Sequence, residues 1–123
     1  MKRILVCEKE EVLLTALEFR MRKQGYEVDQ APDGKVALEK IREKEPDMVI
    51  IGTEVKKVPG LDVIREIRES INPELPIIVI APLEAEGDIM KAYQLGANDF
   101  VTKPFKPVEL VLRVRRQFEI KRR

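Results

Sequence analysis

The stretch that most constrains the fold of this chain runs from Pro46 to Thr53. Its centre, Met48 to Ile51, is an unbroken apolar run, with Pro46 before it and Gly52 after it. So short an apolar run between turn-forming residues predicts a strand that is buried on both faces. Such strands lie in parallel sheets covered by helices, and ligands in these folds bind at the carboxyl ends of the strands. The residue at that end is Gly52, which has no side chain with which to do chemistry.

Four other segments have the length of strands, and amphipathic segments lie between them. The expected strands, besides the central one, cover residues 3–7, 26–31, 76–81 and 98–102. The expected helices cover residues 12–23, 34–45, 60–71, 84–95 and 107–121. In each helix, apolar residues recur at intervals of three and four positions, which is typical of one buried face.

Several single residues mark where these elements begin and end. Asp33 is a favourable N-cap for the second helix, and Pro107 suits the first turn of the last one. Gly25 and Gly96 suit the C-terminal caps of the first and fourth helices. In the fourth helix, we expect Tyr93 to face inward.

Strands that alternate with helices form an α/β fold with a parallel sheet. Right-handed crossovers leave few topologies. The strand order 2-1-3-4-5 fits best, because strands one and three are the most buried and strand two has the pattern of an outer strand. No linker, internal repeat or low-complexity tract interrupts the 123 residues, so we expect one domain over residues 1–123.

Composition excludes several classes of function. The chain has no histidine, which excludes Ser/His/Asp and Cys/His catalysis and histidine metal sites. Lys and Arg number 23 against 22 Asp and Glu, so the net charge is too small to attract the domain to nucleic acid. Cys7 is alone, which excludes an internal disulfide, and we expect it to be a small buried side chain. No apolar run approaches the ~20 residues that span a bilayer, and no signal peptide precedes the first strand, so we expect a cytoplasmic protein without membrane contact.

A series of short motifs gives a more specific indication. They are Ile4-Leu5-Val6, Gly25-Tyr26-Glu27-Val28, Ala31-Pro32-Asp33-Gly34 with Ala37-Leu38, Pro46-Asp47, Pro59-Gly60-Leu61-Asp62, Pro76-Ile77-Ile78 and the run from Gly96 to Phe105. Through these motifs the whole chain resembles a receiver domain of bacterial two-component response regulators, and the last run is the most specific. The resemblance implies a flavodoxin-like, receiver-type fold, with a five-stranded parallel sheet and five helices on its two faces.

The resemblance also implies where the family's phosphorylation chemistry would lie. That chemistry needs a phosphoacceptor aspartate at the end of the third strand and two carboxylates after the first strand, which hold Mg²⁺. It also needs a hydroxyl group at the end of the fourth strand and a lysine after the fifth. Carried over position by position, these sites fall on Gly52, on Glu8 and Lys9, on Ala81 and on Lys103. Only Glu8 and Lys103 keep the required residue type.

These replacements change both the chemistry and the charge of the pocket. Glycine cannot form an aspartyl phosphate, and Lys9 with Lys103 outnumber Glu8, so a divalent cation would meet net repulsion. We therefore expect a pseudo-receiver with no catalytic residue, metal or cofactor, in which Lys103 pairs with Glu8. Two alternatives stay open. One is a phosphorylatable receiver switch that accepts phosphate from a histidine kinase. The other is an anion-binding flavodoxin-like protein. We expect Lys9, Lys56 and Lys57 to be solvated charges of the loops, and an anion site formed by them is the alternative interpretation.

Other acidic residues are poor substitutes for the missing acceptor. Glu54 lies two residues beyond Gly52, in the loop. Asp47 is at the opposite end of the third strand, Asp62 is in the first turn of the third helix, and Asp99 begins the fifth strand. We expect none of them to reach the pocket.

The last helix carries more apolar residues than one buried stripe requires. Its expected core face consists of Val111, Val114 and Phe118. Val108 and Leu112 form a separate stripe, which we expect to be exposed beside Phe100 of the fifth strand. An exposed apolar stripe suits docking of a protein partner or effector domain, a component of a histidine kinase system, or another copy of the chain. The expected interaction face therefore comprises the fourth helix, the fifth strand and the fifth helix.

Overall fold

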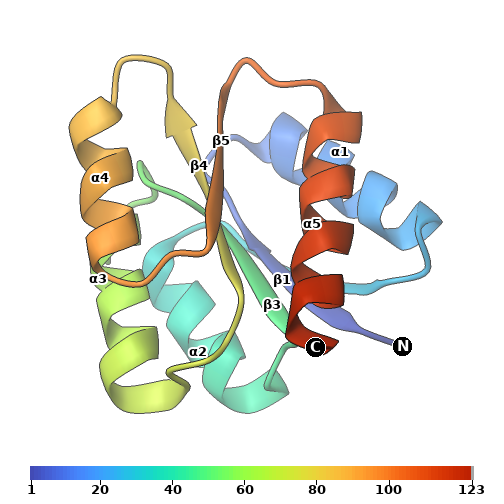
Figure 1. Cartoon of the computed structure of the whole chain (residues 1–123), viewed down its shortest axis with the longest axis horizontal. Helices are drawn as coiled ribbons and strands as arrows, with labels where there is room; N and C mark the ends of the chain where they lie inside the picture. The colour runs from blue at the N-terminus through green and yellow to red at the C-terminus, as the bar shows by residue number, and fades with distance from the viewer. Residues whose placement is uncertain (123) are drawn as a thin grey trace.

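The computed structural model describes residues 1–122 and has an α/β architecture (Figure 1). Its strands are β1 (Arg3–Cys7), β2 (Glu27–Ala31), β3 (Met48–Gly52), β4 (Ile77–Pro82) and β5 (Asp99–Lys103). Its helices are α1 (Glu11–Lys23), α2 (Gly34–Lys44), α3 (Gly60–Glu66), the π-helical turn η1 (Ile67–Ile71), α4 (Glu86–Gln94) and α5 (Pro107–Arg122). Adjacent strands pair in parallel in the order β2-β1-β3-β4-β5, which confirms the predicted topology.

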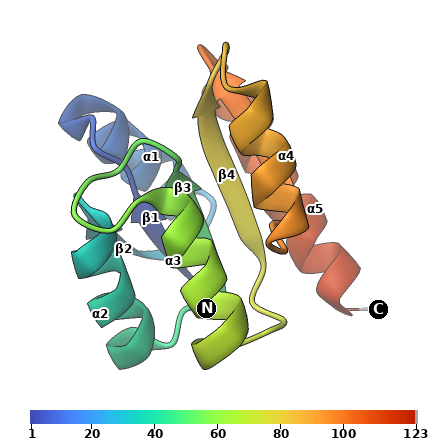
Figure 2. The same cartoon turned by 90° about the vertical axis from the view of Figure 1, so that its left-hand side faces the viewer.

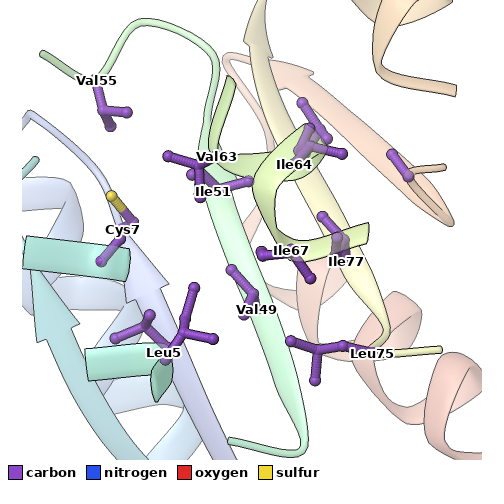
Figure 3. Packing of buried hydrophobic residues seen from close by; sticks show 14 of the residues in the cluster. Leu5, Cys7, Val49, Ile51, Val55, Val63, Ile64, Ile67, Leu75 and Ile77 are labelled. Atoms are coloured by element: carbon purple, nitrogen blue, oxygen red, sulfur yellow. The ribbon is translucent and has the colours of Figure 1, made fainter. Parts of the chain in front are cut away.

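Helices cover both faces of the sheet (Figure 2). Each face has its own hydrophobic core. Successive residues of a strand point to opposite faces. In β1, Leu5 and Cys7 join the core under α2 and α3 (Figure 3), whereas Ile4 and Val6 join the core under α1 and α5. Every residue of β3 is buried, as predicted for the central strand. Within residues 1–122, no helix combines the length and the apolar character that crossing a bilayer requires.

The helix ends follow the predicted signals. The Asp33 carboxylate accepts a hydrogen bond from the Val36 N–H at 2.9 Å and so caps α2. Gly25 and Gly96 follow α1 and α4 with φ of 91° and 109°, a left-handed conformation that glycine adopts without strain. Each of these two turns leads the chain into the next parallel strand.

Two helical features differ from the sequence prediction. The third helix does not stay regular, because its last turn is π-helical and the Asn72 N–H donates to the Ile67 carbonyl at 2.8 Å. Apolar spacing alone does not reveal such a widened turn. The prediction for Tyr93 was wrong: its side chain is exposed, and its ring meets the edge of Phe100 with centroids 5.8 Å apart. Ala92 is the buried residue of α4, and the side chain of Tyr93 lies outside the core.

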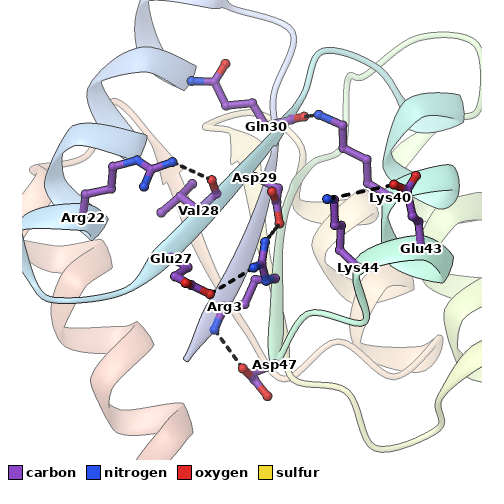
Figure 4. A network of polar contacts seen from close by, with 10 residues as sticks. All are labelled: Arg3, Arg22, Glu27, Val28, Asp29, Gln30, Lys40, Glu43, Lys44 and Asp47. Carbon is purple, nitrogen blue, oxygen red and sulfur yellow. Dashed lines mark hydrogen bonds and ion pairs between the residues drawn. The ribbon is translucent and has the colours of Figure 1, made fainter. Parts of the chain in front are cut away.

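A polar network occupies the amino-terminal edge of the sheet (Figure 4). The Arg3 guanidinium donates to Asp29 at 2.8 Å and to Glu27 at 3.0 Å. The Arg3 backbone N–H donates to the Asp47 carboxylate at 2.8 Å. Asp47 therefore lies at the end of β3 opposite Gly52, as predicted, and helps to join β1 to the start of β3.

Arg68 of η1 forms hydrogen bonds with the turns that precede β4 and β5. Its guanidinium donates to the Gly96 carbonyl at 2.8 and 3.1 Å, and to the Asn72 carbonyl at 3.1 Å. It also donates to Asn98 Oδ1 at 3.0 Å, which accepts the Ile77 N–H at 2.8 Å. Burial lowers the pKa of Arg68, although a guanidinium keeps its charge at any physiological pH.

Replacement of Arg68 by methionine should lower the free energy of unfolding by about 2 kcal/mol, because the Gly96 and Asn72 carbonyls lose their charged donor. Urea titration monitored by circular dichroism measures this loss. Arg65→Met is the matched control on α3. Arg65 bonds Asp62 at 2.8 Å, but both side chains are half exposed, so its loss should stay within about 0.5 kcal/mol. Equal losses for the two variants would contradict the role given to Arg68.

Candidate functional site

The carboxyl edge of the sheet carries the residues that the sequence singled out. Gly52 ends β3 and pairs with Ile80, while Lys103 ends β5 and pairs with Pro82. Glu8 and Lys9 follow β1 directly, in the turn that leads to α1. The parallel topology thus delivers these side chains, from opposite ends of the chain, to one edge.

Glu8 and Lys103 form an ion pair at this edge. Lys103 Nζ lies 3.1 Å from Glu8 Oε2, which confirms the predicted pairing. The same carboxylate oxygen accepts the Glu10 N–H at 2.8 Å, and Glu8 is only 2% exposed. Lys103 Nζ also lies 3.3 Å from Glu10 Oε1. The lysine therefore holds two carboxylates of the β1–α1 turn against the end of β5.

The Glu8 carboxylate lies directly over Gly52. A Cβ atom built on Gly52 would be 2.9 Å from Glu8 Oε1, closer than real Cβ contacts occur. The missing side chain at position 52 therefore provides the space that the Glu8 carboxylate uses. The resemblance implies an acceptor carboxylate on residue 52, and in this chain the carboxylate of Glu8, which follows β1, lies beside that residue.

The ion pair also governs the protonation of Lys103. Burial by itself lowers the pKa of Lys103, but the hydrogen bonds and the negative charges of Glu8 and Glu10 outweigh it, so the pKa lies above its ordinary value. Cys7, next to this pair, is fully buried, and its Sγ donates to the Asp33 carbonyl at 3.3 Å. Burial, assisted by the charges of Asp33 and Glu8, raises the pKa of Cys7 to about 12, so the thiol stays neutral. Cys7 is the small buried residue that the sequence predicted.

The loop cations do not converge on the pocket. Lys9 lies 3.8 Å from Glu54 in the β3–α3 loop, and both side chains are partly exposed. Lys57 lies 3.6 Å from Asp33 at the start of α2. Lys56 is exposed to solvent in the same loop. Lys9 and Lys57 each serve a different carboxylate, so their charges are already partly neutralised.

Two polar groups near Gly52 were not anticipated from the sequence. Glu10 is the other partner of Lys103. Its position two residues after Glu8 was the one feature of the sequence that could have predicted this contact. The Thr53 hydroxyl is buried without a hydrogen-bond partner among the residues that the structure describes. Ala81, at the position of the family's hydroxyl, is fully buried and offers no polar atom from its side chain.

The donor set at this edge does not fit Mg²⁺. That ion requires near-octahedral oxygen coordination, usually with one or more free carboxylates. Here the Glu8 carboxylate is already bound by Lys103 and by the Glu10 N–H. Over residues 1–122, no group of three or more acidic, cysteine or histidine side chains is arranged to hold a metal. The ammonium group of Lys103 supplies the positive charge that these carboxylates need.

The predicted interaction face has the expected exposure. Val108 and Leu112 of α5 are 54% and 57% exposed, whereas Val111 and Val114 are buried. The buried face of α5 also includes Leu110, which the sequence prediction omitted. Phe118 is partly buried and packs against the same core.

Beside this helix, the start of β5 is held by another ion pair. Arg113 donates to the Asp99 carboxylate at 2.6 Å, and Asp99 also accepts the Phe100 N–H at 2.8 Å. Phe100 is partly buried against the core under α3, with Tyr93 at its edge. Asp99 is therefore committed to α5 and, as predicted, does not reach the pocket, while Asp62 pairs with Arg65 on the surface of α3.

Proteins of known structure share the overall fold. The chain matches the family model described as the response regulator receiver domain over residues 4–115. It is similar to the receiver domain of NtrX from Brucella abortus, with 30% identity, a TM-score of 0.89, and coverage of 94% of this chain and 98% of that chain. It is also similar to a response regulator receiver domain protein from Clostridium thermocellum, with 25% identity, a TM-score of 0.92, and coverage of 99% and 98%.

Two further structures define the limits of the similarity. A CheY-like receiver domain protein from Methanospirillum hungatei shares the fold, with a TM-score of 0.93, 18% identity, and coverage of 99% of this chain and 97% of that chain. A longer NtrX structure from Brucella abortus is covered over only 28% of its length, although 98% of this chain takes part in the match. The same fold thus also occurs as one part of a longer protein.

Proposed function

The chain belongs to the response regulator receiver domain family, and we propose that it is a pseudo-receiver, which acts through protein contacts without phosphorylation of an aspartate. Receiver domains are generally signalling domains rather than enzymes, and they interact with kinases or effector domains of two-component systems. The proposal therefore keeps the family's partners and removes its covalent switch. We take residues 1–123 as one receiver-like domain.

One observation carries this proposal: the Glu8 carboxylate lies over Gly52 and is bound by Lys103 at 3.1 Å. A receiver that accepts phosphate needs a free carboxylate on residue 52 and a cation beside it. Here residue 52 has no carboxylate, and the nearby one is buried and paired. Ala81 adds to the argument, because its side chain could not hydrogen-bond a phosphoryl group.

The phosphorylatable alternative makes a different prediction for the intact protein. After incubation with acetyl phosphate and Mg²⁺, we expect no adduct of about 80 Da, the mass of a phosphoryl group, by intact-mass spectrometry. A receiver domain that has the full set of acidic site residues, treated in parallel, supplies the positive control. An adduct that maps to Glu8, Glu10, Thr53 or Glu54 would show that the pocket accepts phosphate by another route, and would overturn the proposal.

The contact surface that we propose is the α4–β5–α5 face, defined by Phe100, Val108 and Leu112. Support comes from the exposure of Val108 and Leu112 and from the exposed Met90 on α4. Charges on this face are divided, since α4 begins with Glu86 and Asp88 while α5 exposes Arg116, one helical turn after Leu112. A protein partner or effector domain with a complementary apolar surface could dock there without any change in the pocket.

A further inference from the structure

The outer face of α1 carries an apolar stripe that the core does not use. Leu14, Leu17 and Met21 form the buried face of this helix. On the opposite side, Val12 is 85% exposed and Phe19 is 59% exposed. A single exposed apolar residue is ordinary on a protein surface, but two large ones that share a helix face form a patch. This patch lies on a different helix from the α4–β5–α5 face and does not depend on the pocket.

The patch is a hollow between side chains of α1, and the large side chain of Phe19 lies at one end of it. Val12, Thr15, Ala16 and Phe19 lie at positions i, i+3, i+4 and i+7, which is the spacing of the four residues that receive a side chain from a facing helix. In the structure these four residues, with Glu11, line a surface hollow. Its floor consists of the small residues Thr15 and Ala16, and Val12 and Phe19 form its ends.

We propose that this hollow receives Phe19 from a second copy of the chain, so that two α1 helices pack antiparallel about a two-fold axis. The face carries both the hole and an aromatic side chain large enough to fill it, and a two-fold interface requires such self-complementarity. Each Phe19 would lie opposite Thr15 and Ala16 of the other copy, where small side chains leave room. Two equivalent insertions then bury both aromatic rings.

The charges at the two ends of α1 agree with this arrangement. In the antiparallel pair, Phe19 of one copy lies opposite Thr15 and Ala16 of the other. Four residues further along, Lys23 of the first copy therefore lies opposite Val12 and Glu11 of the second. Among the side chains that the structure describes, no ion pair involves Glu11. Lys23 Nζ lies over the Phe19 ring of its own chain, 5.1 Å from the ring centroid. Lys23 thus lies beside the ring that would enter the other copy, where it would be close to Glu11 of that copy.

The size of the patch sets the expected strength of association. One helix of 13 residues offers less surface than the ~800 Å² per partner that a stable interface buries. The dimer should therefore be weak and concentration-dependent, populated in the upper micromolar range and dissociated on dilution. Association of this kind would bring two copies together without blocking the α4–β5–α5 face.

Sedimentation equilibrium of the full chain across a wide concentration range tests the proposal. For the wild type, the average mass should rise toward twice the monomer value. Phe19→Glu should stay monomeric at every concentration, with an unchanged circular dichroism spectrum, because the side chain is exposed. Glu11→Lys and Lys23→Glu should each weaken association several-fold, and the double variant should regain it. Leu112→Asp, on the other face, should associate like the wild type.

Cross-linking supplies an independent measurement of the register. Ala16 lies close to the proposed two-fold axis, so Ala16→Cys should form a disulfide-linked dimer under mild oxidation, whereas Ser70→Cys on η1 should not. The native Cys7 is buried and does not compete. A wild type that stays monomeric throughout would overturn the proposal. So would an association that Leu112→Asp abolishes and Phe19→Glu leaves intact, because the other copy would then occupy the α4–β5–α5 face.

Discussion

Replacement of Lys103 by methionine should destabilise this domain by about 3–5 kcal/mol, the largest loss that we expect from a single charged residue. The reason is the environment of Glu8, which is 2% exposed and, of the hydrogen-bond partners that the structure describes, would keep only the Glu10 N–H. Methionine is similar in length to the aliphatic part of lysine, so the change removes charge more than packing. Chemical denaturation at neutral pH measures the loss.

A double-mutant cycle separates the ion pair from other effects of the substitution. Glu8→Met combined with Lys103→Met should cost less than Lys103→Met alone, because no buried charge is then left without a partner. Lys9→Met is the matched control in the same turn, since its ion pair with Glu54 is partly exposed and should contribute less than about 1 kcal/mol. If the double variant loses as much as the sum of the two single variants, the pair has no coupling and the proposed role of Lys103 is wrong.

The pH dependence of the same difference has a defined sign. The folded-state pKa of Lys103 lies above the ordinary value of 10.5, so folding favours the protonated lysine. Its stabilising contribution is complete below the ordinary pKa and is lost as the pH rises through the folded-state pKa. The gap in stability between the wild type and Lys103→Met should therefore be constant near neutral pH and narrow in strongly alkaline solution. A gap that widens in alkaline solution would contradict the assignment.

Gly52→Asp, the change that restores the family's acceptor residue, should by itself cost about 2–3 kcal/mol and bind no Mg²⁺. The new side chain would begin 2.9 Å from Glu8 Oε1, and a third carboxylate would then join Glu8 and Glu10 around Lys103. Gly52→Asp combined with Lys9→Asp should bind Mg²⁺ saturably, because two new carboxylates join Glu8 and one cation is removed. Isothermal calorimetry of the two variants measures binding directly.

Gly52→Asn is the control that separates crowding from charge. It has nearly the same shape as the aspartate variant but adds no carboxylate, so it should cost less stability and should bind no Mg²⁺ when combined with Lys9→Asp. Tight Mg²⁺ binding by Gly52→Asp alone would show that Lys9 does not obstruct the site. It would also show that Glu8 moves away from residue 52 more easily than its buried ion pair suggests.

The sequence predicted most of what depends on local patterns. The apolar run of β3 lies at the centre of the sheet because apolar side chains are the ones that can be buried on both faces without partners. Gly25 and Gly96 end helices because glycine adopts left-handed φ without strain. The pairing of Lys103 with Glu8 also followed, because parallel topology brings the ends of β1 and β5 to the same edge.

The features that were not predicted depend on side-chain conformations within the folded backbone. Neither spacing nor composition shows that the Glu8 carboxylate lies over Gly52, because this position results from a rotamer choice and from the bond to the Glu10 N–H. Tyr93 lies at a helical position that suits burial, but α4 packs through Ala92 and leaves the ring outside. The spacing of Leu14, Leu17 and Met21 predicts the buried face of α1, but it does not show that Val12 and Phe19 line a hollow on the opposite face.

The ion pair between Glu8 and Lys103 joins residues 95 positions apart in the sequence. On the ribosome, where chains grow by about 5–20 residues per second, Glu8 emerges at least several seconds before its partner. During that interval a carboxylate at the end of β1 has no lysine with which to enter the protein interior. Burial of this edge must therefore wait for β5, so the nascent domain can complete its fold only after β5 has left the ribosome. In a chain that stops before β5, this edge of the sheet should remain exposed to solvent, and the chain should be cleaved readily by proteases.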